Sequence, residues 1–235
     1  MFIQSDRPHD ERLSREARQQ QARATTRRAI LDAALELFVT DGYSRVSIRR
    51  IAAKVEYSPG AIYSYFTSKD EIFFALAEEG FRLLGAQLAH APSDNPLDDI
   101  RAAARRLYEF SNAQPQYFAL VFLDRHVPRI GREYERFAFM SELRARLLAQ
   151  MQRCIETGVF PATVQVDVAL NLIRAPILGI AALRLSQRLT PEDADALALD
   201  AIETTIAGLR AGAPSHARSA LPCASTSHTE AVRTV

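Results

Sequence analysis

Apolar residues recur at helical spacing along most of the chain. The first clear run begins near Thr26 and places Ile30, Ala34 and Phe38 on one face, a helical turn apart. Gly42 ends this run, because glycine readily adopts the left-handed conformation found after a helix C-terminus. No stretch of alternating β-branched residues predicts a strand. The pattern therefore predicts an all-α protein.

Polar start signals divide the next part of the chain into short helices. Ser47 can cap a helix over residues 48–55, and Ser58 followed by Pro59 is a second start signal. A capping box at 68–71 opens a longer helix that continues to about residue 90. Two short helices joined by a tight turn predict a helix-turn-helix, whose second helix can enter the DNA major groove.

The turn formers at 91–96 mark a boundary between two domains. We expect a DNA-binding domain over 24–90, which includes the connecting helix 68–90, and a second domain over 96–210. Residues 1–23 read as a flexible basic arm and 211–235 as a disordered tail. The helices expected in the second domain span about 96–113, 116–126, 131–156, 165–188 and 191–210.

Charge is distributed unevenly along the chain. The net charge is only +1, yet residues 43–69 contain five basic side chains against one acidic side chain. A nucleic-acid partner would therefore bind the first third of the chain. In that region, residues 62–66 concentrate Tyr and Ser hydroxyls that can donate hydrogen bonds to phosphates, and Gly60 lets the backbone approach them.

Composition excludes several other classes of protein. Hydrophobic residues make up 48% of the chain and charged residues 24%, as in soluble globular proteins. The two cysteines, Cys154 and Cys223, are too few for a disulfide framework or a cysteine-based zinc site. The longest strongly apolar stretch, 175–183, is too short to span a bilayer, and residues 1–21 contain no apolar signal segment. We expect a cytoplasmic protein without cofactor, metal or membrane partner.

The segment 26–73 resembles the DNA-binding domain of the TetR family of bacterial transcriptional regulators. The resemblance rests on several pieces in order, each weak alone and specific together. They are Ile30-Leu-Asp-Ala-Ala-Leu-Glu-Leu-Phe38, Asp41-Gly-Tyr43, Ser47-Ile-Arg-Arg-Ile-Ala52, Ser58-Pro-Gly-Ala-Ile-Tyr-Ser-Tyr-Phe66 and Ser68-Lys-Asp-Glu71.

The resemblance implies that residues 58–66 form the recognition helix. It places near phosphates the side chains of Ser47, Tyr63, Tyr65 and Lys69. It places near base edges, or where the backbone approaches them, Arg49, Ser58, Pro59, Gly60, Ala61 and Ser64. Tyr63 can instead lie in the core with only its hydroxyl exposed, and Arg49 and Arg50 can pair with local carboxylates.

Two positions depart from the family pattern. Glu56 stands where the family commonly has glycine, and Tyr57 where it has a small aliphatic residue. In a left-handed conformation a non-glycine residue costs about 1–2 kcal/mol. Glu56 then tunes the turn or contacts a cytosine. The basic residues of 12–28 either reach phosphate or the minor groove, or belong to a solvated tail.

The resemblance implies that residues 96–210 bind a ligand and form a homodimer through helices 165–188 and 191–210. The first of these helices is apolar nearly all round, and the second carries a face of small residues. Pro176 removes a backbone hydrogen bond from the first helix, so we expect a kink there. Asn171 and Arg174 lie in that stretch, where they line a pocket, contact the dimer mate or face solvent.

Aromatic residues outside the DNA-binding region suggest a pocket for a hydrophobic or aromatic small molecule. The candidates are Tyr108, Phe118, Phe122, Phe137 and Met140, with Arg125, His126 or Arg174 answering an acidic group. The alternative is that the aromatic side chains form the domain core.

The sequence thus predicts a homodimeric repressor that a small ligand releases from a palindromic operator. An activator, or a regulator that needs no ligand, remains open. An all-α enzyme is the remote alternative, since the sequence has no glycine-rich phosphate loop, Glu-x-x-His pair or Ser/His/Asp arrangement.

Overall fold

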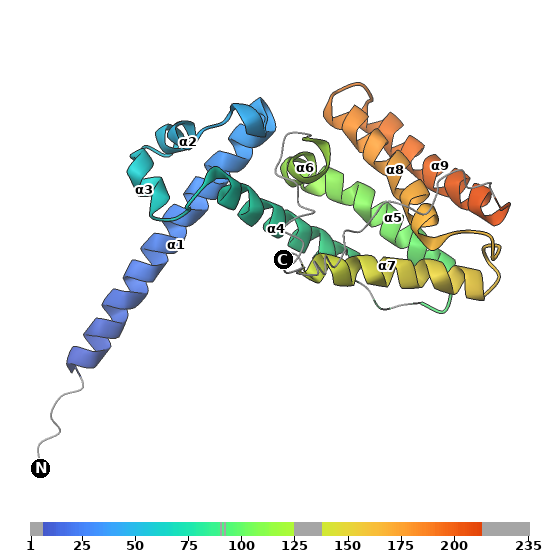
Figure 1. Ribbon diagram of the computed structural model, residues 1–235, viewed down its shortest axis with the longest axis horizontal. Coiled ribbons are helices and arrows are strands. Elements are labelled where there is room, and N and C mark those ends of the chain that lie inside the picture. Colours follow the sequence, from blue (N-terminus) through green and yellow to red (C-terminus); the bar gives the residue numbers. More distant parts are fainter. Residues whose placement is uncertain (1–6, 90, 92, 125–137, 213–235) are drawn as a thin grey trace, which may run out of the picture. The chain divides into compact units, whose positions relative to one another are not determined.

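The computed structural model describes residues 7–89, 91, 93–124 and 138–212, and these contain helices and no strand (Figure 1). Along the chain the elements are α1 (Arg7–Asp41), η1 (Tyr43–Arg45), α2 (Ile48–Lys54), α3 (Pro59–Tyr63), α4 (Lys69–Leu88), α5 (Pro96–Ala113), α6 (Pro115–Phe118), η2 (Ala119–Leu123), α7 (Ala138–Glu156), α8 (Val166–Leu185) and α9 (Pro191–Arg210). The all-α prediction is confirmed.

The helices divide into two compact units, and the division differs from the one expected. The first unit contains α1 to α4 as far as Leu83, together with α6 and η2. The second contains the end of α4 with α5, α7, α8 and α9. We had expected α6 and η2 in the second domain, because they follow the boundary at 91–96. Buried apolar side chains join them to the first unit instead.

The core of the first unit includes the apolar face predicted for α1, on which Ile30, Ala34 and Phe38 are buried. Ile30, Ile51, Ile62 and Phe66 are almost completely buried. The ring of Tyr43 extends this core, with its centroid 5.2 Å from that of Phe38 and 5.5 Å from that of Phe73. The core thus ties α2 and α3 to α1 and α4.

α1 begins much earlier than the apolar pattern predicted. It starts at Arg7, whereas the pattern placed the first helix near Thr26 and a flexible arm before it. Every side chain from 15 to 25 is exposed, so this part of α1 has no apolar face for a periodicity argument to find. It is rich in Ala, Arg and Gln, which have high helix propensity.

α6 and η2, a π-helical turn, are fixed to the first unit by aromatic side chains. Phe122 lies between Phe118 and Phe81, with ring centroids 5.0 and 6.1 Å away. Tyr117 lies against Gly80, where a Cβ atom would come within 3.0 Å of Tyr117 Cδ1. Only glycine allows this close approach without displacement of the ring.

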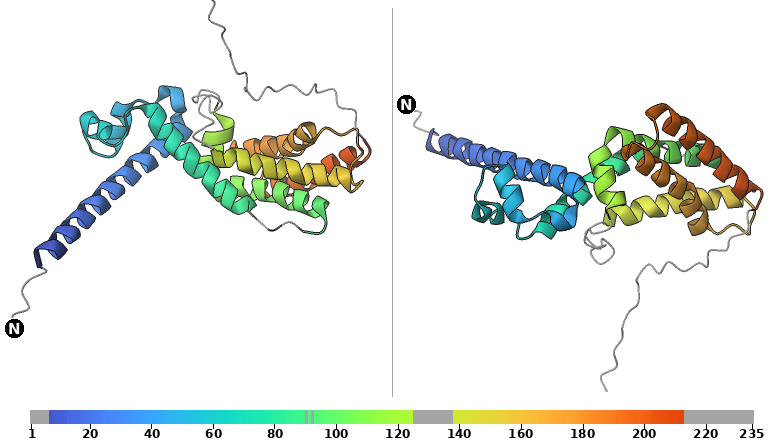
Figure 2. Two further views of the ribbon diagram at one scale, coloured as in Figure 1. Left: turned by 60° about the horizontal axis from the view of Figure 1, so that its bottom comes forward. Right: turned by 90° about the horizontal axis from the view of Figure 1, so that it is seen from above.

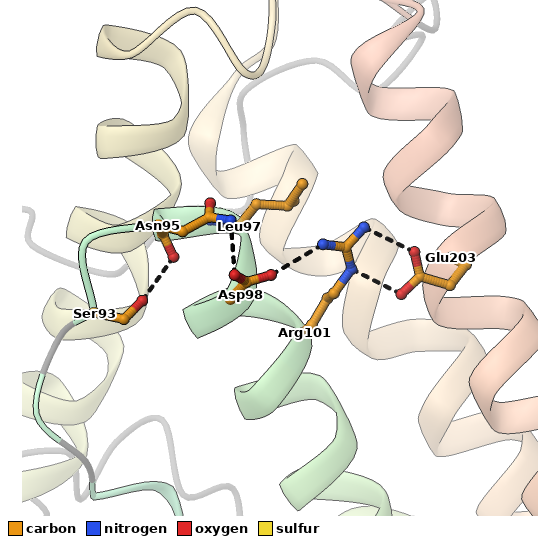
Figure 3. A network of polar contacts seen from close by, with 6 residues as sticks. All are labelled: Ser93, Asn95, Leu97, Asp98, Arg101 and Glu203. Carbon is orange, nitrogen blue, oxygen red and sulfur yellow. Dashed lines mark hydrogen bonds and ion pairs between the residues drawn. The ribbon is translucent and has the colours of Figure 1, made fainter.

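In the second unit, α8 and α9 lie side by side and pack with α5 and α7 around one core (Figure 2). Polar contacts at the α5 N-terminus complete the packing (Figure 3). Asn95 Oδ1 accepts a hydrogen bond from Leu97 N at 3.1 Å, and Arg101 joins Asp98 of α5 to Glu203 of α9. Thr190 caps α9 by accepting a hydrogen bond from Asp193 N at 3.1 Å.

α8 is long and apolar enough to cross a membrane when only its length and composition are considered. Arg174 interrupts the run of apolar residues in this continuous helix, which is why the apolar stretch identified in the sequence was shorter. One face of α8 lies in the core of the second unit through Ala169, Ile173 and Ile177. A core helix passes the same length and composition test.

Candidate nucleic-acid interface

Serine side chains start both short helices, as the sequence predicted. Ser47 Oγ accepts a hydrogen bond from Arg50 N at 3.3 Å and caps α2. Ser58 Oγ accepts from Ala61 N at 3.2 Å and caps α3, with Pro59 at the first helical position. Each cap satisfies a backbone donor that would otherwise lack a partner. The hydroxyl hydrogens of both serines are left to donate outward.

Glu56 turns the chain between the two helices in a left-handed conformation, with φ of 59°. Glu56 N donates to Ala53 O at 3.3 Å and Tyr57 N to Ala52 O at 2.9 Å. This pair of hydrogen bonds is a Schellman motif, which normally has glycine at the left-handed position. The strained turn expected from the departure at Glu56 is therefore confirmed.

α3 presents most of its surface to solvent. Ile62 is buried and anchors the helix, whereas 55% of Tyr63 is exposed. This exposure argues against the alternative in which Tyr63 belongs to the core. Ser58, Pro59 and Gly60 are exposed as well. A Cβ atom at Gly60 would meet only Ser58 Oγ, at 3.9 Å, so the fold itself does not require glycine here.

The residues after α3 are held from both sides. Ser64 Oγ donates to Ala61 O at 2.7 Å, so the hydroxyl can still accept a hydrogen bond. Arg23 of α1 donates to Ser64 O at 3.1 Å and lies over the ring of Tyr65. Sequence reasoning missed this use of Arg23, since it treated that stretch as a flexible arm.

Lys69 is held within the first unit. Its Nζ donates to Tyr43 O at 2.9 Å and Val46 O at 3.1 Å and lies 3.9 Å from the centre of the Tyr43 ring. The Tyr43 hydroxyl donates to Asp70. Burial, reinforced by this hydrogen bond, raises the pKa of the Tyr43 hydroxyl above its ordinary value. An ammonium has three donors, and these two hydrogen bonds use two of them.

The basic side chains near α2 divide into paired and exposed groups. Arg50 forms an ion pair with Asp41 at 2.7 Å, and Lys54 with Glu36 at 2.8 Å. Arg50 thus follows the alternative of pairing with a local carboxylate. Arg49 is exposed, and among the residues that the structure describes no ion-pair partner engages it. Among the basic residues of α2, Arg49 thus differs from Arg50 and Lys54, which both form ion pairs.

A second polar cluster joins α1, α4 and α6. Arg28 Nη1 lies 2.8 and 2.6 Å from the carboxylate oxygens of Glu79, and Arg28 Nε donates to Asp32 at 2.8 Å. Burial is the main cause of a raised pKa at the Tyr117 hydroxyl, and the hydrogen bond to Glu79 raises this pKa further. Since Tyr117 lies beyond the expected boundary, sequence reasoning did not assign it to this unit.

The described residues proposed for a ligand pocket belong to both compact units. Phe118 and Phe122 pack together in the first unit, whereas Tyr108 lies in the second and donates to Asp195 Oδ1 at 2.8 Å. Asn171 Oδ1 is buried on α8 and has no hydrogen-bond partner among the described residues. Arg174 is exposed. Outside the described residues lie Arg125, His126 and Phe137, and for Met140 only the backbone is described.

Comparison with known proteins finds a family match within the first unit and relatives over part of the chain. The family model described as "Bacterial regulatory proteins, tetR family" matches residues 30–76. The transcriptional repressor Rv1474c of Mycobacterium tuberculosis is 36% identical over 80 residues, which are 34% of this chain and 43% of that protein. The nicotine-responsive repressor HdnoR of Paenarthrobacter nicotinovorans is 32% identical over 88 residues, 37% of this chain and 44% of that protein. The chain thus matches less than half the length of these relatives.

Solved structures resemble a larger part of the fold. FadR of Bacillus halodurans, a fatty acid degradation regulator, has a TM-score of 0.62 at 17% identity, with 78% of this chain and 96% of that chain covered. FadR of Bacillus subtilis, solved in complex with stearoyl-CoA, has a TM-score of 0.61 at 16% identity, with coverage of 77% and 97%. At these identities the likeness is one of fold.

Proposed function

The chain belongs to the TetR family of bacterial transcriptional regulators, and from this premise we propose that it is a homodimeric repressor of a palindromic operator. A small ligand releases it from the DNA. The exposed surface of α3 is the observation that carries the proposal. A helix whose only buried side chain is Ile62, and whose exposed residues include Tyr63 and Gly60, has its surface open to a partner.

The major groove admits an α-helix, and the residues around α3 supply the donors and acceptors that DNA recognition needs. Tyr63, Tyr65 and Ser47 have hydroxyls for phosphates, and Arg49 has a guanidinium that can reach a guanine edge. The transcriptional regulator acts in the cytoplasm, where the operator is.

A second copy of the chain covers α8 and α9. Leu172 and Leu183 on α8 are 45% and 37% exposed, and Leu197 and Leu199 on α9 are 43% and 47% exposed. Exposed leucines on two adjacent helices favour an isologous four-helix interface, which also accounts for the apolar length of α8. Light scattering after size exclusion without detergent should give a dimer, and Leu172→Arg should give a monomer. A wild-type monomer would contradict this part of the proposal.

The effector is a hydrophobic or aromatic small molecule that binds the second domain. Two similarities support this chemistry, since one relative is nicotine-responsive and one structure of the same fold contains stearoyl-CoA. Ligand binding shifts the population toward a dimer in which the separation of the two α3 helices no longer matches the half-site spacing. Stearoyl-CoA and nicotine are therefore the first probes to test for release of DNA.

A gel-shift titration tests the function directly. The wild-type chain is titrated onto the region upstream of its own gene and onto random DNA at several salt concentrations. Preference for the upstream region supports the proposal, whereas equal affinity for both would contradict it. Tyr65→Phe should weaken binding equally across sequences, and Ser64→Ala should change the base preference.

A further inference from the structure

Two arginines of α1 contact the end of α3. Arg23 Nη2 donates to Ser64 O at 3.1 Å, and the Arg23 guanidinium carbon lies 5.5 Å from the centre of the Tyr65 ring. One turn later on α1, the Arg27 guanidinium lies 4.8 Å from the centre of the Phe66 ring. These contacts cover three consecutive residues at the point where the recognition helix ends.

The recognition helix needs such support because it is short. α3 has five residues, from Pro59 to Tyr63, and an isolated helix of this length is unstable in water. Its start is fixed by the Ser58 cap, but the last carbonyls of a helix have no partner within the helix. The Arg23 guanidinium supplies a donor to the carbonyl of Ser64, the residue that caps this end.

We propose that Arg23 is a positioning residue for DNA recognition. It fixes the C-terminal end of α3 and so sets the direction in which Tyr63 and Ser64 face the bases and phosphates. This inference rests on the proposed DNA-binding function and assigns to it a residue before the stretch 30–76 that the family model matches. The guanidinium provides both a hydrogen bond and a planar surface for Tyr65, whereas a lysine provides a donor and a positive charge but no planar surface.

The test compares Arg23→Ala and Arg23→Lys with Arg15→Ala. Arg15 is an exposed arginine on the same helix, so its removal changes the charge equally. Fluorescence anisotropy measures binding to a duplex that the wild-type chain selects from a random library and to a shuffled duplex of the same composition. We expect Arg23→Ala to lower affinity for the selected duplex about tenfold and to leave the shuffled duplex and the salt slope unchanged. Arg23→Lys should lose about threefold, and Arg15→Ala should keep the wild-type ratio of the two affinities.

Several outcomes would overturn the proposal. Equal loss of affinity on both duplexes, with a salt slope lower by about one, would make Arg23 a phosphate contact instead. If Arg23→Ala keeps the wild-type ratio of affinities for the selected and the shuffled duplex, the contact does not position α3. If thermal unfolding shows that Arg23→Ala does not fold, the test uses the folded Arg23→Lys variant instead. A wild-type ratio of the two affinities in Arg23→Lys then refutes the proposal. Failure of the wild-type chain to select any sequence would instead contradict the DNA-binding function.

Discussion

Asp124 accepts a hydrogen bond from the backbone N–H of Tyr43, with 2.8 Å between Oδ2 and N. Asp124 directly follows η2, and Tyr43 begins the η1 turn that leads into α2. The contact therefore joins a segment of the chain's second half to the entrance of the helix-turn-helix.

Asp124→Ala tests the strength of this connection. The substitution removes a charged acceptor and leaves the partly buried Tyr43 N–H without it, so we expect stability to fall by about 1–3 kcal/mol. Urea unfolding followed by circular dichroism measures the change. Asp124→Asn is the matched control, because its amide oxygen can still accept and should keep most of the stability. Equal losses in the two variants would assign the effect to the charge rather than to the hydrogen bond.

The local structure of the first unit was predictable because its signals are short-range. The start signals at Ser47 and Ser58 depend on hydrogen bonds to residues three positions away, and both formed as expected. The capping box at Ser68 formed in part. Ser68 Oγ accepts from Glu71 N at 3.1 Å, but Glu71 reaches back to Thr67 rather than to Ser68.

The assignment of α6 and η2 to the first unit was not predictable from the local pattern. It depends on Tyr117 lying against Gly80 and on Phe122 packing with Phe81, contacts between residues far apart in sequence. The role of Arg23 was missed for a different reason. α1 is helical there without an apolar face, and helical periodicity is detected only through such a face.

Glu56→Gly should stabilise the protein. Glycine removes the cost of about 1–2 kcal/mol that a non-glycine residue has in the left-handed backbone conformation. It also lowers stability by about 0.5–1 kcal/mol, because it increases the entropy of the unfolded chain. We therefore expect a net gain of about 0.5–1 kcal/mol in urea unfolding. Glu56→Ala removes the same charge but keeps the strain at φ of 59°, so it should leave stability nearly unchanged. A similar gain in both variants would attribute the effect to charge.

Gly60→Ala should separate folding from DNA binding. Within the chain the new methyl group would meet only Ser58 Oγ, at 3.9 Å, and alanine favours the helix, so stability should stay the same or rise. On the DNA side the methyl group keeps the α3 backbone from approaching the phosphates, and we expect affinity to fall about tenfold. Gly85→Ala makes the same change on α4 in open space and should bind DNA normally. Unchanged affinity in Gly60→Ala would show that α3 does not approach DNA at this point.

The Cys154 thiol should make the protein less stable in alkaline solution. Cys154 is buried in the second unit, and burial raises the pKa of its thiol from 9.0 to about 11. Between these two pH values the folded state retains a proton that the unfolded state loses. The stability that the protonated thiol contributes is therefore fully present below about pH 9 and is lost as the pH rises toward 11. Urea unfolding at pH 8 and pH 10.5 should show a smaller decline for Cys154→Ala than for the wild type. Tyrosines with raised pKa values, such as Tyr43, contribute equally to both proteins and cancel in this comparison. Cys223→Ser is the matched control and should keep the wild-type decline, whereas an equal decline in Cys154→Ala would show that Cys154 does not contribute to it.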